Sequence, residues 1–354
     1  MTTSEKEGGH SAFKRTQLRH KRQSAAPNRM DDLNEFCDFC NPDQNTRIHR
    51  INMIEDNSLS EDLYQGPVFG IQGFSGFLYA PQALSPSLQQ KLSYLAVSEF
   101  CQSPHATNID LVPPKLSEQM NEEESMWNLW KRENSCDITN KSNNKCTKVY
   151  RSFKKLSWAT MGYQYDWTRR TYHEGSKSVM PECLVKLSIC FAKTSLRIAK
   201  AQSTSFTASA AIVNYYNEKS IMGGHRDDLE LALDKPVISF SMGMPAIFLL
   251  GGKTKHQTPI VPILVRPGDV MILGGDSRLN YHGMARTIPP SAMLPSIEST
   301  LSKSLPSVQF TLKGKDILIP QSDLEPLGNF LQTHRININV RQVLPDDVSS
   351  MSKS

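Results

Sequence analysis

The second half of the chain contains six short β-type runs separated by turn residues, and this spacing restricts the fold more than any other feature. The runs are SAAIVNYY, VISFSM, AIFLLGG, IVPILV, VMILGG and RININVRQV, all between residues 208 and 345. No GxGxxG motif appears and the runs do not alternate regularly with helices, so a Rossmann fold is disfavoured. The pattern predicts a mainly β fold with flanking helices, built on a double-stranded β-helix (jelly-roll) core.

Three details add to this fold prediction. Pro267 and Gly268 suit the central positions of a type II turn between two of the runs. The stretch from Phe240 to Phe248 is typical of a hairpin interrupted at Gly243. Residues 287–329 are rich in Pro and Ser, so we expect an insertion that leaves the core as a surface excursion before the last strand.

The last run, RININVR, places its polar side chains on one face. Because strand side chains alternate, Arg335, Asn337, Asn339 and Arg341 share one side, and Ile336, Ile338 and Val340 share the other. An edge strand with a wet face would show the same alternation. Two arginines and two amides without a balancing acid favour a wall that binds a small dicarboxylate, because guanidinium groups bind carboxylates bidentately. Asn214 and Tyr216, two residues apart on another run, point the same way and would add a second wall, although Tyr216 taken alone is more typical of a core aromatic with a satisfied hydroxyl.

A candidate metal site begins with the stretch GGHRDDL, in which His225 lies two residues before Asp227. Alone, this triplet is more often an exposed charged loop than a ligand pair. His282 follows after several predicted strands, about where a jelly roll returns to the same end of its barrel. Two histidines and one carboxylate form the facial triad that binds Fe(II) and leaves positions open for a cosubstrate and O₂.

Taken together, NYY, His225, Asp227, His282 and RININVR, in this order, resemble the AlkB family of Fe(II)- and 2-oxoglutarate-dependent dioxygenases over residues 66–345. The resemblance implies that the two histidines and Asp227 are the iron ligands. It also implies that 2-oxoglutarate and O₂ are consumed, that succinate and CO₂ are released, and that N-methyl groups leave as formaldehyde.

The resemblance also assigns roles to the polar walls. Arg335, helped by Tyr216, is implied to bind the distal carboxylate of 2-oxoglutarate, whereas Arg341, Asn337 and Asn214 are implied to hold the end that chelates iron.

An aromatic cluster before the β-type runs matches the nucleotide-recognition lid of the family. We expect Trp158 to stack on a flipped or unpaired base, and Tyr163 and Tyr165 to contact base or phosphate. At Leu229 the bacterial family member carries an acid near the cationic methylated base, so recognition of a charged base in that manner is in doubt.

The expected substrate is a methylated base in nucleic acid, with tRNA favoured over DNA. The alternatives are an oxygenase that acts on methylated histones or other protein side chains, a non-enzymatic nucleic-acid-binding scaffold, and a cupin-like metal hydrolase. We further expect a monomer that does not enter a membrane, in the nucleus, cytoplasm or mitochondrion.

The chain divides into segments that differ in composition and hydrophobic pattern. We expect a disordered basic tail over residues 1–65, an N-terminal extension with the lid over 66–207, the core over 208–345 and a flexible tail over 346–354. Within the first segment the stretch from residue 10 to 29 carries basic side chains and no acid, which could attract phosphates or serve as an import signal. The pair Cys37 and Cys40 lacks the second pair that a zinc ribbon needs.

Overall fold

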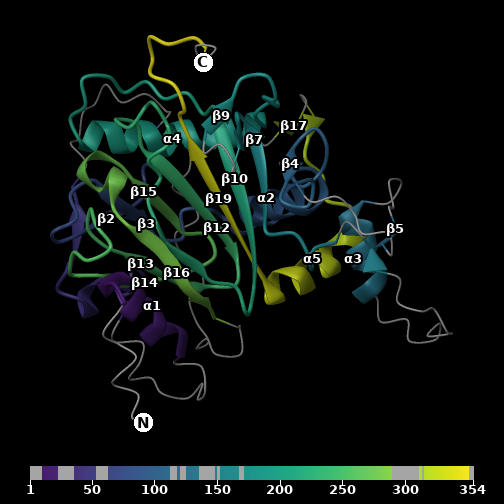
Figure 1. The fold of residues 1–354 in the computed structure, drawn as a ribbon, viewed down its shortest axis with the longest axis horizontal. Coiled ribbons are helices and arrows are strands. Elements are labelled where there is room, and N and C mark those ends of the chain that lie inside the picture. The colour runs from purple at the N-terminus through teal and green to yellow at the C-terminus, as the bar shows by residue number, and fades with distance from the viewer. Residues whose placement is uncertain are drawn as a thin grey trace.

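A computed structural model describes residues 10–22, 36–52, 63–111, 118–119, 125–134, 148–149, 152–166, 171–288, 311–312 and 315–350. Two antiparallel sheets dominate this part of the chain (Figure 1). The major sheet has the order β1 (Ile48–Ile51), β2 (Val68–Ile71), β3 (Phe77–Ala80), β15 (Val270–Leu273), β12 (Val237–Gly243), β19 (His334–Arg341), β10 (Ala210–Asn217), β7 (Trp158–Gly162) and β4 (Ala106–Thr107). The minor sheet has the order β11 (Met222–His225), β16 (His282–Thr287), β13 (Ala246–Leu250) and β14 (Val261–Val265).

These sheets confirm the predicted jelly-roll core with flanking helices. All six β-type runs are strands, and the last run, β19, lies between β10 and β12 at the centre of the major sheet. Its Ile336, Ile338 and Val340 side chains are fully buried in the largest hydrophobic cluster, because β-branched residues pack well on one face of a pleated sheet. The opposite face of β19 therefore turns its polar side chains toward the cavity between the sheets.

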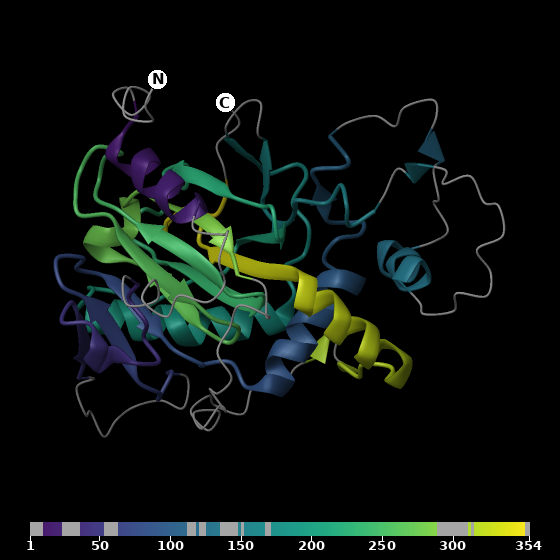
Figure 2. The same cartoon turned by 90° about the horizontal axis from the view of Figure 1, so that it is seen from below.

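Helices cover the outer face of the major sheet (Figure 2). They are α2 (Pro86–Ser98), α4 (Glu182–Ile198) and α5 (Gln321–Thr333), with α3 (Met126–Asn134) packed beside α2. Ser85 caps α2, since its side chain accepts a hydrogen bond from the Leu88 amide. None of the helices in the described part of the chain has the length and apolar character needed to cross a bilayer.

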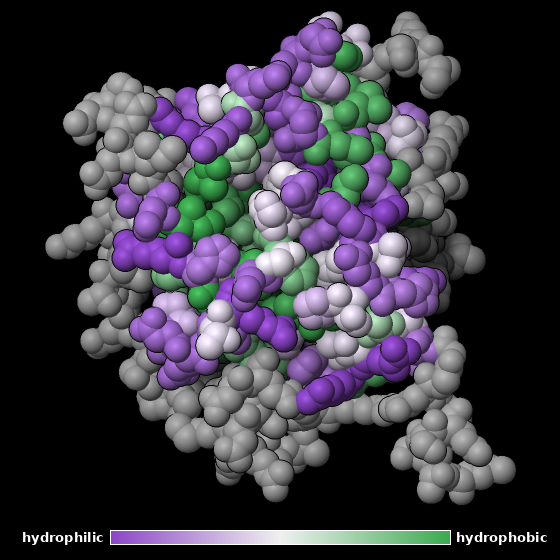
Figure 3. All heavy atoms as spheres, turned by 90° about the vertical axis from the view of Figure 1, so that its left-hand side faces the viewer, coloured by the Kyte–Doolittle hydropathy of each residue, from purple (hydrophilic) through white to green (hydrophobic). Residues whose placement is uncertain are grey.

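Small elements complete the described fold. Three two-stranded pairs are β5 (Glu118–Gln119) with β6 (Lys148–Val149), β8 (Gln164–Asp166) with β9 (Thr171–His173), and β17 (Thr311–Leu312) with β18 (Lys315–Asp316). Two short 3₁₀ helices span Pro42–Gln44 and Gly275–Leu279. On the face shown in Figure 3, hydrophobic groups lie between hydrophilic side chains, as is usual for a protein surface.

The prediction of a disordered tail over residues 1–65 is wrong for much of that segment. Helix α1 (Ala12–Arg22) packs against the minor sheet, and β1 joins the edge of the major sheet. Phe36, Cys37 and Phe39 are buried in the hydrophobic clusters around the minor sheet. The apolar residues of this segment are few and do not follow one period, so their burial becomes visible only when the sheets they cover are in place. Residues 1–9, 23–35 and 53–62 lie outside the described residues.

The predicted hairpin at Gly243 is also wrong. β12 belongs to the major sheet and β13 to the minor sheet, so the chain crosses between sheets at this point. Gly243 has a φ of +74°, and the carbonyl oxygen of His334 occupies the space that a side chain would need. By contrast, Gly268 has the positive φ, +87°, expected at the third position of a type II turn.

The insertion over residues 287–329 is only partly a surface excursion. Its last residues form most of α5, and the next turn of that helix buries Phe330 against Trp127, Trp130 and Phe153. Residues 289–310 lie outside the described part of the chain.

The cysteine pair does not form part of a metal site within the described residues. Cys37 is buried and Cys40 is partly buried, and burial raises the pKa of their thiols to about 11 and about 12, respectively. Thiols that stay protonated are poor metal ligands and poor nucleophiles.

Candidate active site

The two candidate histidine ligands lie directly opposite each other on neighbouring strands. His225 ends β11 and His282 begins β16, and the two residues are register partners in this antiparallel pair. Each ring places its Nδ1 3.0 Å from a backbone carbonyl oxygen, of Gly223 for His225 and of Asn280 for His282. Those bonds fix a proton on Nδ1 and leave Nε2 of both rings free to bind a metal.

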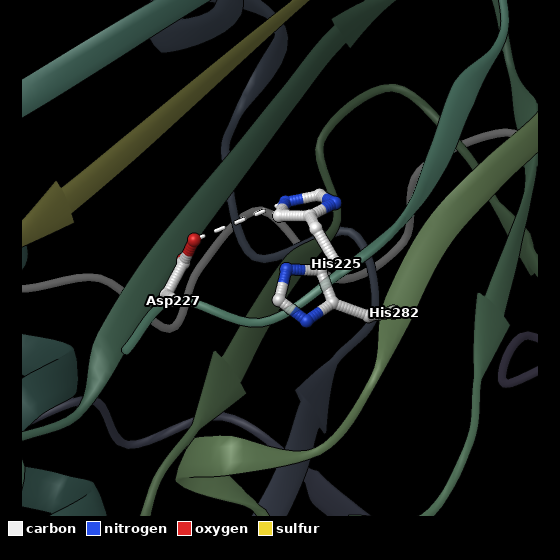
Figure 4. A group of neighbouring side chains, drawn as sticks. All are labelled: His225, Asp227 and His282. Atoms are coloured by element: carbon white, nitrogen blue, oxygen red, sulfur yellow. Dashed lines mark ion pairs between the residues drawn. The ribbon is translucent and has the colours of Figure 1, made fainter. Parts of the chain in front are cut away.

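Asp227 follows β11 and turns its carboxylate toward the histidines, so that the three side chains converge (Figure 4). Its Oδ1 lies 3.8 Å from His225 Nε2, and one donor atom from each of the three residues lies within 4.8 Å of the others. Two imidazoles and one carboxylate at this spacing fit the facial triad of Fe(II). Within the described residues this is the only such group of His, Cys, Asp and Glu side chains.

The electrostatic surroundings keep Asp227 ionised. Burial alone would raise its pKa, but the positive charge of Arg341 and the two histidines hold the pKa well below the usual range. Burial lowers the pKa of His282 to about 4, with a further contribution from His225. Near neutral pH the site therefore offers the ionised Asp227 carboxylate and the neutral His282 imidazole, which are the protonation states that metal ligands require.

A cavity of about 570 Å³ extends from the triad into the space between the sheets. Arg335 and Arg341 from β19 line it, together with Asn337 and Asn339 from the same strand. The predicted polar wall is therefore an inner wall of the cavity. The alternative, an edge strand with a solvent-exposed face, is excluded because β19 lies between two other strands of the sheet. His334, on the opposite face, stacks on Phe330 instead.

Arg335 lies at one end of the wall. Its guanidinium donates to the Ser241 hydroxyl at 2.9 Å and to the Met244 carbonyl at 3.3 Å, and it forms no ion pair with an acidic side chain among the described residues. Tyr216 is its register partner on β10 and lines the same cavity. A buried cation held only by neutral acceptors suits an incoming carboxylate.

An amide row continues the wall toward the triad. Asn214 on β10 and Asn337 on β19 are register partners, and both line the cavity. The Asn337 amide donates to the Ser239 hydroxyl at 2.8 Å and to the Phe240 carbonyl at 3.1 Å, while its oxygen accepts from Asn339 at 3.0 Å. These bonds fix the orientation of the amide, so the hydrogen-bonding capacity that it retains can be directed at a ligand.

A buried charge network behind the triad was not predicted. Arg341 donates to Glu230 Oε1 at 3.0 Å and lies 3.4 Å from Asp227 Oδ2. Arg278 donates to Glu230 Oε2 at 2.9 Å and also to the Asp227 carbonyl oxygen. The Tyr172 hydroxyl donates to Glu230 Oε1 at 2.7 Å. Glu230 could have been noticed three residues after Asp227, but nothing local marks Arg278 or Tyr172 as its partners.

The three predicted lid residues differ in where their side chains lie relative to the cavity. Tyr165 lines the cavity beside Tyr172 and packs edge-on against it, with ring centroids 5.3 Å apart. Trp158 is half-buried on β7, where it is the register partner of Asn214, and it does not line the cavity. Tyr163 is a correction: it is buried, and its hydroxyl donates to Glu174 at 2.9 Å. Tyr163 lies at the bend between β7 and β8, directly after Gly162 with its φ of +72°, and its ring packs in a hydrophobic cluster with Val343 instead of lining the cavity.

Comparison with known proteins agrees with this geometry. Residues 110–341 match the family described as the 2OG-Fe(II) oxygenase superfamily. The chain is 32% identical over 326 residues to "DNA N(6)-methyladenine demethylase ALKBH1A" of Arabidopsis thaliana, covering 88% of this chain and 87% of the plant protein. It is 32% identical over 282 residues to "Nucleic acid dioxygenase ALKBH1" of Homo sapiens, covering 79% and 67%, respectively.

A third relative is the "tRNA demethylase abh1" of Schizosaccharomyces pombe, which is 33% identical over 196 residues, 54% of each chain. The geometry of the triad, the matched family and the share of the chain that these relatives cover all indicate the same type of reaction. The chain belongs to the AlkB family of the 2OG-Fe(II) oxygenase superfamily and is an Fe(II)- and 2-oxoglutarate-dependent dioxygenase.

Proposed function

We propose that this dioxygenase hydroxylates or demethylates a methylated base in nucleic acid, and that tRNA is its main substrate rather than DNA. The observation that carries the proposal is that one cavity joins the triad to an aromatic region with Tyr165, Tyr172 and Leu229. Aromatic rings flanking such a space suit a base taken out of its stack. Relatives named for action on DNA N(6)-methyladenine, on nucleic acid and on tRNA support the substrate class.

The proposed roles of the site residues follow from their positions. His225, Asp227 and His282 hold Fe(II). Arg335, with Tyr216 beside it, binds the distal carboxylate of 2-oxoglutarate at the far end of the wall. Asn214, Asn337 and Arg341 orient the end nearest the metal, and Arg341 is suited to this because it already contacts Asp227.

Bound Fe(II), with 2-oxoglutarate and O₂, supplies an oxidant strong enough to hydroxylate a C–H bond. The chain contributes binding, orientation and exclusion of water. The polar wall fixes the cosubstrate at one side of the cavity, and the apolar residues Ile212, Val237 and Phe248 line it nearby and limit water. An N-methyl group hydroxylated in this space would leave as formaldehyde.

Leu229 bears on which base fits. It lines the cavity and packs with Tyr165 against the cluster that contains Tyr163 and Tyr172. Neighbouring Asp228 is paired with Arg226 at 2.9 Å, and Glu230 is shared by two arginines. The carboxylates near the base position are thus already neutralised, which favours an uncharged methylated base over a cationic one.

Mass spectrometry of nucleosides tests the proposal. Total tRNA, single-stranded DNA and methylated histone peptides are incubated with Fe(II), 2-oxoglutarate and the protein, with His225→Ala as the inactive control. We expect loss of a methylated nucleoside, or gain of its oxidised form, mainly in tRNA. Turnover confined to the peptides would instead establish the protein-side-chain alternative, and turnover mainly in DNA would overturn the preference for tRNA.

A further inference from the structure

The strand that carries His225 is weakly specified by its own sequence. β11 is an edge strand of the minor sheet, has the sequence MGGH, and pairs only with β16. Its register with β16 shifts between Met222 and His225. Glycines have no side chain to pack and widen the range of backbone conformations, so this segment needs support from elsewhere to hold one geometry.

Helix α1 supplies that support from the N-terminal segment, beside the minor sheet in both Figures 1 and 2. The amide nitrogen of Gln17 donates to the carbonyl oxygen of Met222 at 2.7 Å and to that of Met284 at 3.3 Å. These two residues are register partners on β11 and β16. Lys14 contacts the Gln17 amide oxygen at 3.1 Å, which orients the amide nitrogen toward the strands. One side chain thus joins both strands that carry the histidines.

A second contact lies next to His225 itself. The Phe13 ring is buried against Gly224, so closely that a Cβ added to Gly224 would come within 2.5 Å of it. The same ring packs on Gly251 and against Tyr281, the residue before His282. The Phe13 amide donates to the Lys255 carbonyl at 3.0 Å, which anchors the start of α1 to the loop after β13.

We propose that α1 is a strap that positions the iron ligands, with Gln17 and Phe13 as its positioning residues. The strap holds the β11–β16 pair in the register that places the two histidines opposite each other. Docking of α1 therefore raises metal affinity without contact between α1 and the metal. This inference concerns the iron site alone and holds for any substrate.

Metal affinity of the full-length protein tests the strap. Mn(II) binding is followed by the electron paramagnetic resonance signal of free Mn(II) for Gln17→Met, which keeps the size of the buried side chain and removes the donor. We expect the Kd for Mn(II) to rise about tenfold, as for other residues that orient metal ligands. Lys21→Ala, on the exposed face of the same helix, should leave Kd unchanged. A Kd unchanged within twofold for Gln17→Met would overturn the proposal.

The unmodified protein provides a second test that does not depend on folding of a variant. Coupling between two sites is reciprocal, so Mn(II) must stabilise the docking of α1 by the same factor by which docking improves Mn(II) binding. Hydrogen exchange of the α1 amides should slow about tenfold when Mn(II) is added, even though α1 does not contact the triad. Exchange in α1 that is insensitive to the metal refutes the coupling.

Discussion

At the scale of single residues, the active site depends on charges that are buried and matched. Arg335 contacts only neutral acceptors, whereas Arg341 is shared between Asp227 and Glu230. The two arginines lie on the same face of β19 but have different partners. The reason is that their neighbours on β12 and in the loop after β11 differ.

We predict that Arg335→Lys weakens binding of 2-oxoglutarate. Lysine keeps the charge but cannot present two parallel donors to a carboxylate, and lost hydrogen bonds to a charged group correspond to a rise in KM of roughly 10- to 100-fold. Steady-state kinetics with varied 2-oxoglutarate measures this change. Arg50→Lys on the exposed part of β1 is the matched control and should behave as the wild type.

We also predict that Glu230→Gln destabilises the fold. The side chain is 1% exposed and balances Arg278 and Arg341, so its neutralisation leaves two buried guanidinium groups undercompensated. The expected loss is about 3–5 kcal/mol in the free energy of unfolding. Urea unfolding measures it. Tyr172→Phe, which removes one hydrogen bond to the same carboxylate, should cost only about 1 kcal/mol.

At the scale of elements, contacts between helices and strands set the site from outside. Helix α5 runs directly into β19, and α3 packs near it through Asp323, which accepts from Trp127 Nε1 at 2.8 Å and from Lys131 Nζ at 2.6 Å. The N-terminal end of β19 therefore follows a helix that is packed against residues more than 190 positions away in sequence.

The contacts of Asp323 with Trp127 and Lys131 predict that the stability of the fold depends on pH. Burial would raise the pKa of Asp323, but Lys131 and Trp127 lower it below the usual Asp value. A carboxylate whose pKa is lowered in the folded state contributes stability above its unfolded pKa of about 4, and loses it as pH falls through the folded value. Asp323→Asn should therefore be less stable than wild type at pH 7, by about 1–2 kcal/mol, with a difference that shrinks below pH 4.

Urea unfolding at pH 7, 5 and 3.5 checks this sign. Asp316→Asn, on an exposed strand of the same region, is the control and should show no comparable change. A wild-type advantage that grows toward low pH would contradict the assignment of Asp323 as the ionised partner.

At the scale of the whole molecule, the proposed sites for the metal and for the cosubstrate lie on different sheets. The triad lies on β11, β16 and the loop that follows β11, whereas the polar wall lies on β10 and β19 of the other sheet. Ligands that bridge the cavity should therefore stabilise the core as a unit.

We predict that Mn(II) with 2-oxoglutarate raises the free energy of unfolding by about 2.7 kcal/mol when the limiting ligand is at 100 times its Kd. Thermal or urea unfolding with and without a chelator measures the effect. His225→Ala should show no stabilisation by Mn(II), and if it is stabilised as much as wild type, the metal binds elsewhere.

The sequence by itself determined the class of fold and most of the site chemistry. Alternation in RININVR predicted the inner wall, because a strand of known period fixes which side chains share a face. The order of His225, Asp227 and His282 suggested a metal site, and the resemblance to the AlkB family implied that these residues are the iron ligands. It missed β11 and β16 as strands, since MGGH and HGMART contain glycine and lack alternation.

Only the tertiary structure decided how distant segments complete the site. The pairing of His225 with His282, the partners of Glu230, the burial of Tyr163 and the docking of α1 all join residues far apart in the chain. Such contacts depend on which surfaces the sheets leave uncovered, and no local period encodes them. The sequence therefore indicated which functional groups the site contains, whereas tertiary packing determines where those groups lie.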